Sequence, residues 1–125
     1  MRALPQTLSF LLLLAVLSAS QAQDAPPLIE EICQASLLRD DAAKCLLFSN
    51  PAFSNPTNQK NRINLTVRAS TDDANTWRTV VVLHPGPSAY SCLVALGAAT
   101  AGSLYENGEK RPYEKITFAR FGLAP

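Results

Sequence analysis

The 125-residue sequence has few of the residues that build metal centres. It contains one histidine, His84, and three cysteines, none of them in C-x-x-C spacing. Structural zinc sites use four cysteine or histidine ligands, so the sequence predicts no metal site, and it suggests no other cofactor. The odd number of cysteines, Cys33, Cys45 and Cys92, leaves at least one unpaired in a monomer, and the pairing stays open.

A charge excess of either sign is absent as well. Eleven lysines and arginines face ten aspartates and glutamates, and the formal net charge is +1. Nucleic acids and anionic membranes attract strongly basic proteins. This balance therefore predicts neither as a partner.

Long apolar runs are also missing, with one short exception near the N-terminus. The run Leu8 to Leu17 follows the basic Arg2 and precedes small residues. It is about half of the roughly 20 residues that a membrane-spanning helix needs. Residues 1–22 therefore predict a secretory signal peptide, followed by a short linker at 23–29. We expect a chain without a membrane span after cleavage, secreted or in the secretory pathway: extracellular, periplasmic or lysosomal, depending on the host.

No helical stripe longer than two turns is present after the linker. Short runs rich in β-branched and aromatic residues alternate with turn residues, which predicts an all-β fold. The expected strands are Glu31 to Leu38, Lys44 to Ser49, Arg62 to Ser70, Trp77 to His84, Ser91 to Leu96, Ala99 to Glu106 and Tyr113 to Phe121. Among the predicted breakers are Asp40-Asp41 and Pro85-Gly86-Pro87. Spacing alone is compatible with a sandwich, a barrel or part of a propeller.

One of these strands alternates cleanly. Ile63, Leu65, Val67 and Ala69 fall on one face, opposite Asn64, Thr66, Arg68 and Ser70. Such alternation is typical of an antiparallel strand with one buried face. The first face is expected to be core. Asn64 also begins the sequon Asn64-Leu-Thr66, which permits N-glycosylation in a eukaryotic secretory pathway.

A turn motif follows this strand. The segment Ser70-Thr-Asp-Asp-Ala-Asn-Thr-Trp77 resembles the Asp-box, S-x-D-x-G-x-T-W, at Ser70, Asp72, Thr76 and Trp77. The Asp72 side chain is expected to accept backbone N–H groups of its own turn, and Trp77 to cover the sheet. Ala74 stands where the motif has glycine, the residue that adopts positive φ at low cost.

Six segments, in order, resemble the end of the exo-α-sialidase catalytic domain, the glycosidase family also called neuraminidases. They are Cys45-Leu-Leu-Phe-Ser-Asn-Pro-Ala52, Arg62-Ile-Asn-Leu-Thr-Val-Arg68, the Asp-box (or BNR repeat), His84-Pro-Gly-Pro-Ser-Ala-Tyr-Ser91, Leu104-Tyr-Glu106 and Tyr113-Glu-Lys-Ile-Thr-Phe-Ala-Arg120. Ile32-Cys-Gln-Ala-Ser-Leu-Leu38 resembles the strand before them. The resemblance implies that residues 30–125 are a C-terminal fragment of a sialidase-type β-propeller, about the last two of six blades.

The resemblance also implies a function and three site residues. Sialidases remove terminal sialic acid from glycoconjugates, with retention and a tyrosine nucleophile. By position, Tyr90 matches that nucleophile, Arg62 matches the third arginine of a triad that binds the sialic acid carboxylate, and Glu106 matches a carboxylate that orients another triad arginine. A guanidinium suits the carboxylate because its planar donors meet both oxygens.

Other parts of that active site have no matching positions. The first two triad arginines, the aspartate acid/base and the glutamate that activates the tyrosine lack counterparts. The resemblance therefore implies a truncated chain, of poor stability and without measurable activity alone. Two alternatives remain open: a non-catalytic secreted β module that binds glycans or a protein, and a fragment without a function of its own.

A serine nucleophile is the rival reading of the same segment. Gly86-Pro-Ser88-Ala-Tyr90 begins like the G-x-S-x-G elbow of hydrolases, but bulky Tyr90 replaces the closing glycine. That strained turn demands a small residue. The serine interpretation is therefore rejected.

Overall fold

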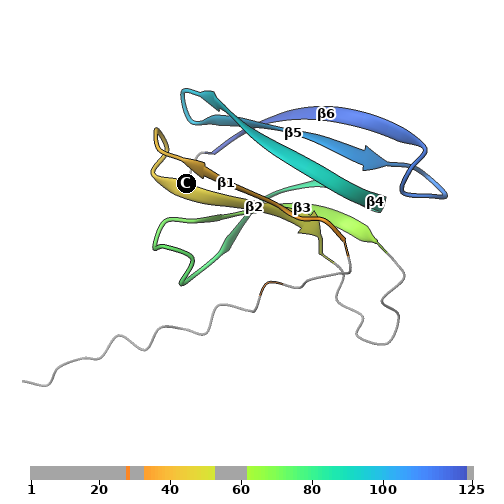
Figure 1. Ribbon diagram of the computed structural model, residues 1–125, viewed down its shortest axis with the longest axis horizontal. Coiled ribbons are helices and arrows are strands. Elements are labelled where there is room, and N and C mark those ends of the chain that lie inside the picture. The colour runs from red at the N-terminus through yellow and green to blue at the C-terminus, as the bar shows by residue number, and fades with distance from the viewer. Residues whose placement is uncertain (1–27, 29–32, 53–61, 124–125) are drawn as a thin grey trace, which may run out of the picture.

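The computed structural model describes residues 28, 33–52 and 62–123 (Figure 1). The predicted signal peptide lies outside these residues, as does nearly all of the predicted linker. The described part contains six strands and no helix: β1 Ser36–Asp40, β2 Cys45–Pro51, β3 Ile63–Ser70, β4 Arg78–Gly97, β5 Thr100–Asn107 and β6 Lys115–Gly122. The all-β prediction is confirmed.

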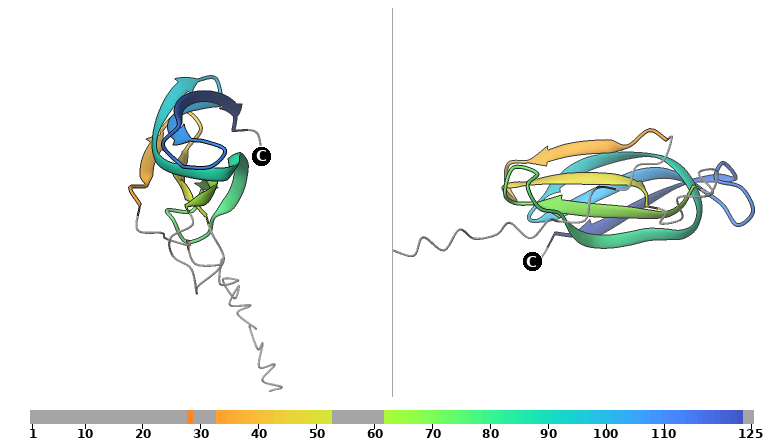
Figure 2. Two further views of the ribbon diagram at one scale, coloured as in Figure 1. Left: turned by 90° about the vertical axis from the view of Figure 1, so that its right-hand side faces the viewer. Right: turned by 90° about the horizontal axis from the view of Figure 1, so that it is seen from below.

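The six strands form one sheet in sequence order, and each is antiparallel to the next. β4 is 20 residues long and serves two neighbours. Its first half pairs with β3, and its second half, from Ser88 onward, pairs with β5. The sheet therefore curls, and β5 and β6 come to lie across from β1 to β3 (Figures 1 and 2).

The prediction of two separate strands in the β4 region is wrong. Pro85-Gly86-Pro87 was expected to interrupt them, yet the strand continues through it. Proline fixes φ near −65°, which is compatible with extended backbone, although it offers no N–H to a ladder. The neighbours compensate, because Pro87 lies opposite Ile63 and the Ser88 N–H donates to the Arg62 carbonyl at 2.8 Å.

The first strand also differs from its prediction. β1 begins at Ser36, not near Glu31, which lies outside the described residues, and it includes Asp40, expected as a breaker. The turn comes directly after Asp40. The Asp40 carboxylate accepts the N–H groups of Ala42 and Ala43, both at 3.0 Å, so this residue ends the strand and caps the turn.

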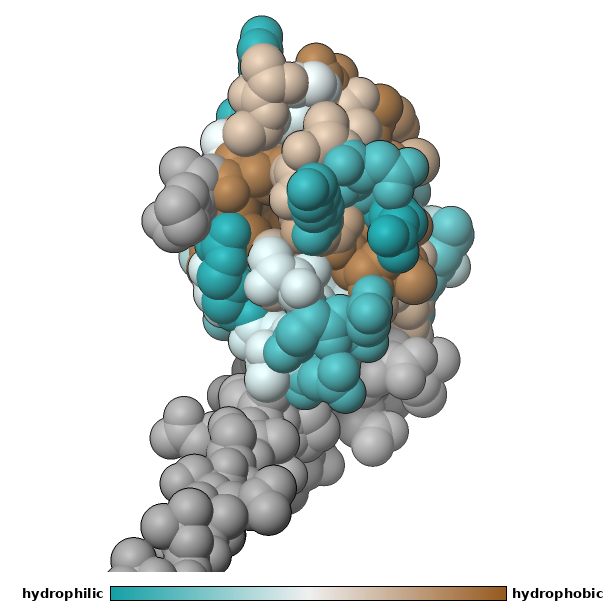
Figure 3. Space-filling model, turned by 90° about the vertical axis from the view of Figure 1, so that its left-hand side faces the viewer, coloured by the Kyte–Doolittle hydropathy of each residue, from teal (hydrophilic) through white to brown (hydrophobic). Residues whose placement is uncertain are grey.

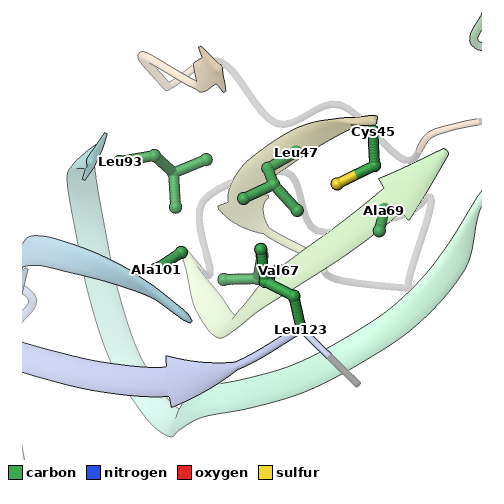
Figure 4. Close-up of a cluster of buried hydrophobic side chains, with 7 residues drawn as sticks. All are labelled: Cys45, Leu47, Val67, Ala69, Leu93, Ala101 and Leu123. Carbon is green, nitrogen blue, oxygen red and sulfur yellow. The ribbon is translucent and has the colours of Figure 1, made fainter. Parts of the chain in front are cut away.

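The core lies inside the curl (Figure 4). Its buried members are Cys45, Leu47, Val67, Ala69, Leu93, Ala101 and Leu123. The predicted core face of β3 is confirmed for Leu65, Val67 and Ala69. Thr66 and Ser70 on the other face are also buried, because the curl and the following turn cover both sides of this strand.

Serine hydroxyls join the two walls of the curl. The Ser49 and Ser91 hydroxyls are 2.7 Å apart in the interior, and the Leu93 N–H donates to the Ser36 hydroxyl at 3.0 Å. A buried polar group costs free energy unless it is hydrogen-bonded. These bonds therefore hold β1 and β2 against the second half of β4.

The outer face of β4 to β6 is apolar. It exposes Val94, Leu96, Leu104, Ile116 and Phe118. Figure 3 shows one end of the molecule, where hydrophobic residues reach the surface mainly in the upper half of the view. On β6, Thr117, Ala119 and Phe121 point toward the interior instead and are half-buried.

Candidate functional site

Three strands bring the predicted site residues together. Arg62 precedes β3, Tyr90 lies in the second half of β4, and Glu106 lies near the end of β5. The guanidinium carbon of Arg62 is 5.9 Å from the centre of the Tyr90 ring. On the β5 side, the Tyr90 N–H donates to a Glu106 carboxylate oxygen at 3.4 Å. Residues separated by up to 44 positions thus meet around Tyr90.

Tyr90 is accessible from solvent. Its side chain is 45% exposed, and it lines an open cavity of about 190 Å³ together with Glu106, Cys92, Leu104, Ile116 and Gln34. Pockets for small ligands usually measure about 300 to 1,000 Å³. The cavity beside the Tyr90 ring is therefore smaller than such a pocket, and it is open to solvent.

No carboxylate of the described residues bonds to the Tyr90 hydroxyl. A carboxylate oxygen of Glu106 accepts the Tyr90 backbone N–H instead. A free tyrosine has a pKa near 10 and needs a neighbouring base to react at neutral pH. Glu106 is therefore not placed as that base.

Arg62 has a contact that the sequence did not reveal. Its Nη1 donates to the Tyr113 hydroxyl at 2.5 Å, so the guanidinium contacts the phenols of both Tyr113 and Tyr90. Tyr113 is 51 positions away, and its phenol is 59% exposed. No local pattern could have indicated this pair, because it depends on the curl of the sheet.

The loop that carries Tyr113 is held by Glu114. This carboxylate accepts the backbone N–H groups of Glu109 at 2.8 Å, Lys110 at 3.2 Å and Arg111 at 3.0 Å. The Glu109 bond is the largest cause that lowers the pKa of Glu114; burial opposes it, and the bonds from Arg111 and Lys110 add to the lowering. The carboxylate therefore stays ionised at neutral pH and keeps the loop closed.

The Ser70 to Trp77 turn has the contacts that its sequence predicts. The Asp72 carboxylate accepts the Thr76 N–H at 2.8 Å and the Thr76 hydroxyl at 2.6 Å. The hydroxyl bond is the main cause of the lowered pKa of Asp72. Trp77 packs edge-on against Phe48, with ring centres 5.9 Å apart. The turn lies at the start of β4 and supports the sheet rather than the Tyr90 region.

Replacing Ala74 with glycine should stabilise the protein. Ala74 has φ of 69°. A residue with a Cβ loses about 1 to 2 kcal/mol in the left-handed region, and glycine avoids this cost. The greater conformational freedom of glycine stabilises the unfolded chain by about 0.4 to 1 kcal/mol and offsets part of the gain. We expect the free energy of unfolding to rise by about 0.5 to 1 kcal/mol in a urea titration. The exposed strand residue Ala95 is the control, since Ala95→Gly should lower stability; a loss in Ala74→Gly would contradict the strain argument.

The structure also places Ser88 and His84, which bear on the rejected serine nucleophile, and Asn64, the residue of the glycosylation sequon. The Ser88 hydroxyl is buried with no hydrogen-bond partner among the described residues, while His84 Nε2 lies 3.1 Å from the Gly108 carbonyl oxygen. This arrangement is unlike a serine–histidine pair. Asn64 is exposed with φ of 65°, so its side chain is accessible, and glycosylation there stays a prediction.

Two further features are absent from the described residues. That part of the chain holds no cluster of three histidine, cysteine or acidic side chains able to hold a metal ion. It also has no helix of the length and apolar character that crossing a bilayer requires.

Two of the cysteines differ in their surroundings. Cys45 is buried, which raises the pKa of its thiol, and Cys92 is exposed two residues from Tyr90.

Comparison with known proteins shows similarity to sialidases. The chain is 44% identical over 82 residues to a sialidase of Micromonospora viridifaciens, an alignment that covers 66% of this chain and 11% of that protein. It is 35% identical over 103 residues to bovine sialidase-3, covering 79% of this chain and 24% of the relative. Human sialidase-4 is 33% identical over 78 residues, covering 57% and 16%. The matches thus span about a tenth to a quarter of these relatives, and no family model matches the chain.

Proposed function

Because this chain belongs to the sialidase family, we propose that it serves the removal of terminal sialic acid from glycoconjugates by a retaining reaction. Its curled antiparallel sheet is part of a sialidase-type β-propeller. The observation that carries the proposal is the contact between Arg62 and Tyr90, with 5.9 Å between the guanidinium carbon and the ring centre. An anion held by Arg62 lies next to the Tyr90 phenol.

The role of Arg62 is to bind the carboxylate of the sugar. A guanidinium stays charged at every relevant pH and can donate two parallel hydrogen bonds to a carboxylate. In sialic acid the carboxylate is attached to the anomeric carbon itself. Binding at Arg62 therefore brings the reacting carbon toward the neighbouring phenol of Tyr90.

The role of Tyr90 is that of the nucleophile. Its oxygen attacks the anomeric carbon as the bond to the leaving oxygen breaks, the phenol proton passes to a base, and the leaving oxygen takes up a proton. Water then releases the sugar from the tyrosine, and two inversions give net retention. A neutral phenol suits this attack because an anionic carboxylate would approach the sugar carboxylate against like charge. Glu106 orients the backbone at Tyr90 through its bond to the N–H.

A second candidate is a glycan-binding module without turnover. It is favoured by the hydroxyl of Tyr90, which has no carboxylate partner among the described residues, while Arg62 is arranged to bind. General acid and base groups each contribute about 10²- to 10⁴-fold in rate. Unless residues outside the described part supply them, we expect binding of sialosides by the isolated chain and no measurable hydrolysis.

A sialoside titration and a fluorogenic sialoside assay on the purified chain test these roles. Arg62→Ala should weaken binding about tenfold or more, because a charge-assisted pair contributes roughly 1.5 to 3 kcal/mol. Arg62→Lys should recover only part of this loss. The control is Arg39→Ala, which removes a guanidinium that pairs with Asp41 next to the β1–β2 turn and should leave the affinity unchanged.

The Tyr90→Phe variant separates the two candidates. It removes only the reactive hydroxyl, so binding should persist. Turnover by the wild-type chain that Tyr90→Phe abolishes would establish the enzyme over the module. Turnover that survives in Tyr90→Phe would exclude Tyr90 as the nucleophile, and wild-type chain that binds no sialoside would overturn the role of Arg62.

A further inference from the structure

The Arg62–Tyr113 hydrogen bond assigns a role to a residue outside the predicted site. We propose that Tyr113 is a positioning residue: its hydroxyl, held by the β5–β6 loop, orients the Arg62 guanidinium for the carboxylate of the ligand. This inference rests on the proposed function of Arg62. It adds a residue from the far end of the chain to a site otherwise built from Arg62, Tyr90 and Glu106.

The loop between Asn107 and Lys115 is rigidly built. Glu114, next to Tyr113, accepts three backbone N–H groups of the loop. Gly108 is buried at the base, where a Cβ would lie 2.6 Å from a Glu114 carboxylate oxygen. The Thr117 hydroxyl also donates to the Asn107 side chain at 2.8 Å. Tyr113 is thus presented by a closed loop, although its own side chain is mostly exposed.

The loop and Arg62 are attached to the same stretch of β4. The Gly108 N–H donates to the Pro87 carbonyl at 3.0 Å, and the next residue, Ser88, donates its N–H to the Arg62 carbonyl at 2.8 Å. His84 Nε2 adds a contact of 3.1 Å to the Gly108 carbonyl oxygen. Because Gly108 and Arg62 are both hydrogen-bonded to Pro87-Ser88, the distance between the backbone of the loop and that of Arg62 is fixed. The Tyr113 hydroxyl therefore meets the guanidinium at a defined place.

The contact with Tyr113 occupies one nitrogen of the Arg62 guanidinium. A guanidinium has five N–H donors, and the phenol oxygen accepts from Nη1. The Tyr90 ring lies against the same group, with its centre 5.9 Å from the guanidinium carbon. A long side chain loses rotamer freedom when it binds a ligand, and prior ordering removes part of that cost. Tyr113 should thus strengthen carboxylate binding without contacting the ligand.

The test is a double-mutant cycle with the full chain and a methyl α-sialoside as the probe. Tyr113→Phe should weaken binding about three- to tenfold, and it should have no further effect in an Arg62→Ala background. Thr100→Val is the control, because it removes another exposed side-chain hydroxyl, which donates to the Ala98 carbonyl at 3.3 Å in the turn between β4 and β5. Equal affinities of Tyr113→Phe and the wild-type chain would overturn the proposal.

A ligand-free measurement keeps the test independent of the proposed function. The NMR signal of the Arg62 Nε–Hε group should shift in Tyr113→Phe and stay in place in Thr100→Val. If the wild-type chain binds no sialoside, the function of Arg62 fails, while a shifted signal still supports the positioning role. An Arg62 signal unchanged in Tyr113→Phe would overturn it. Since Tyr113 is 59% exposed, the loss of its hydroxyl should leave the fold intact.

Discussion

Leu47→Ala is expected to lower the free energy of unfolding by about 2 to 5 kcal/mol, the usual range for a buried leucine. Leu47 is 0% exposed and lies in the core cluster inside the curl (Figure 4). The substitution removes apolar contacts and leaves a cavity that neighbouring strands fill only in part. Domains are typically stable by 5 to 15 kcal/mol, so much of the stability would be lost. Urea unfolding followed by Trp77 fluorescence measures the effect.

Leu37→Ala is the matched control for this prediction. Leu37 lies on β1, the neighbour of β2, and is 65% exposed. The same chemical change at an exposed site should alter stability by no more than about 0.5 kcal/mol. Equal losses in the two variants would show that the interior of the curl is not the packed core.

Gly108→Ala is expected to destabilise the protein by about 1 to 3 kcal/mol, the cost typical of an overpacked site. An added Cβ would lie 2.1 Å from the Arg111 carbonyl oxygen and 2.6 Å from a Glu114 carboxylate oxygen. The Arg111 backbone can move away from this Cβ only if the loop between Asn107 and Lys115 opens. The Tyr113 hydroxyl would then leave Arg62, so sialoside affinity should fall at least as far as in Tyr113→Phe.

Gly122→Ala provides the comparison for the glycine effect. A Cβ at Gly122 meets nothing within 4 Å. The change should therefore be neutral or slightly stabilising, since alanine reduces the freedom of the unfolded chain. Unfolding curves and a sialoside titration of both variants measure the two effects. A stable Gly108→Ala with unchanged affinity would show that the loop does not determine the position of Arg62.

Local patterns in the sequence were sufficient for much of the fold. The alternation from Ile63 to Ser70 identified the buried Leu65, Val67 and Ala69, because side-chain direction in a strand depends on its two-residue period. The turn contacts of Asp72 were also predictable, since both partners lie within a few residues. Arg62, Tyr90 and Glu106 were singled out by the resemblance of short ordered segments to sialidases.

The errors occurred where pairing partners override local preference. Pro85-Gly86-Pro87 has the composition of a break, but Pro87 pairs with Ile63 of β3 and its carbonyl accepts the Gly108 N–H, so the strand continues. On β6 both faces carry apolar residues, so the sequence does not indicate that Ile116 and Phe118 are exposed while Phe121 is half-buried. Which face is exposed depends on the direction in which the whole sheet curls.

The sequence by itself predicted the β-strands, and its short segments, matched in order to those of sialidases, singled out Arg62 and Tyr90, because each strand and each segment depends on residues close together in the chain. Only the tertiary structure decided that Arg62 lies against Tyr90, that Glu106 bonds to the backbone of Tyr90, and that Tyr113 joins Arg62 from 51 positions away. These contacts join strand ends far apart in sequence. They exist because β4 pairs with β3 in its first half and with β5 in its second half, so that the sheet curls. This curl is a property of the whole sheet and of no single segment.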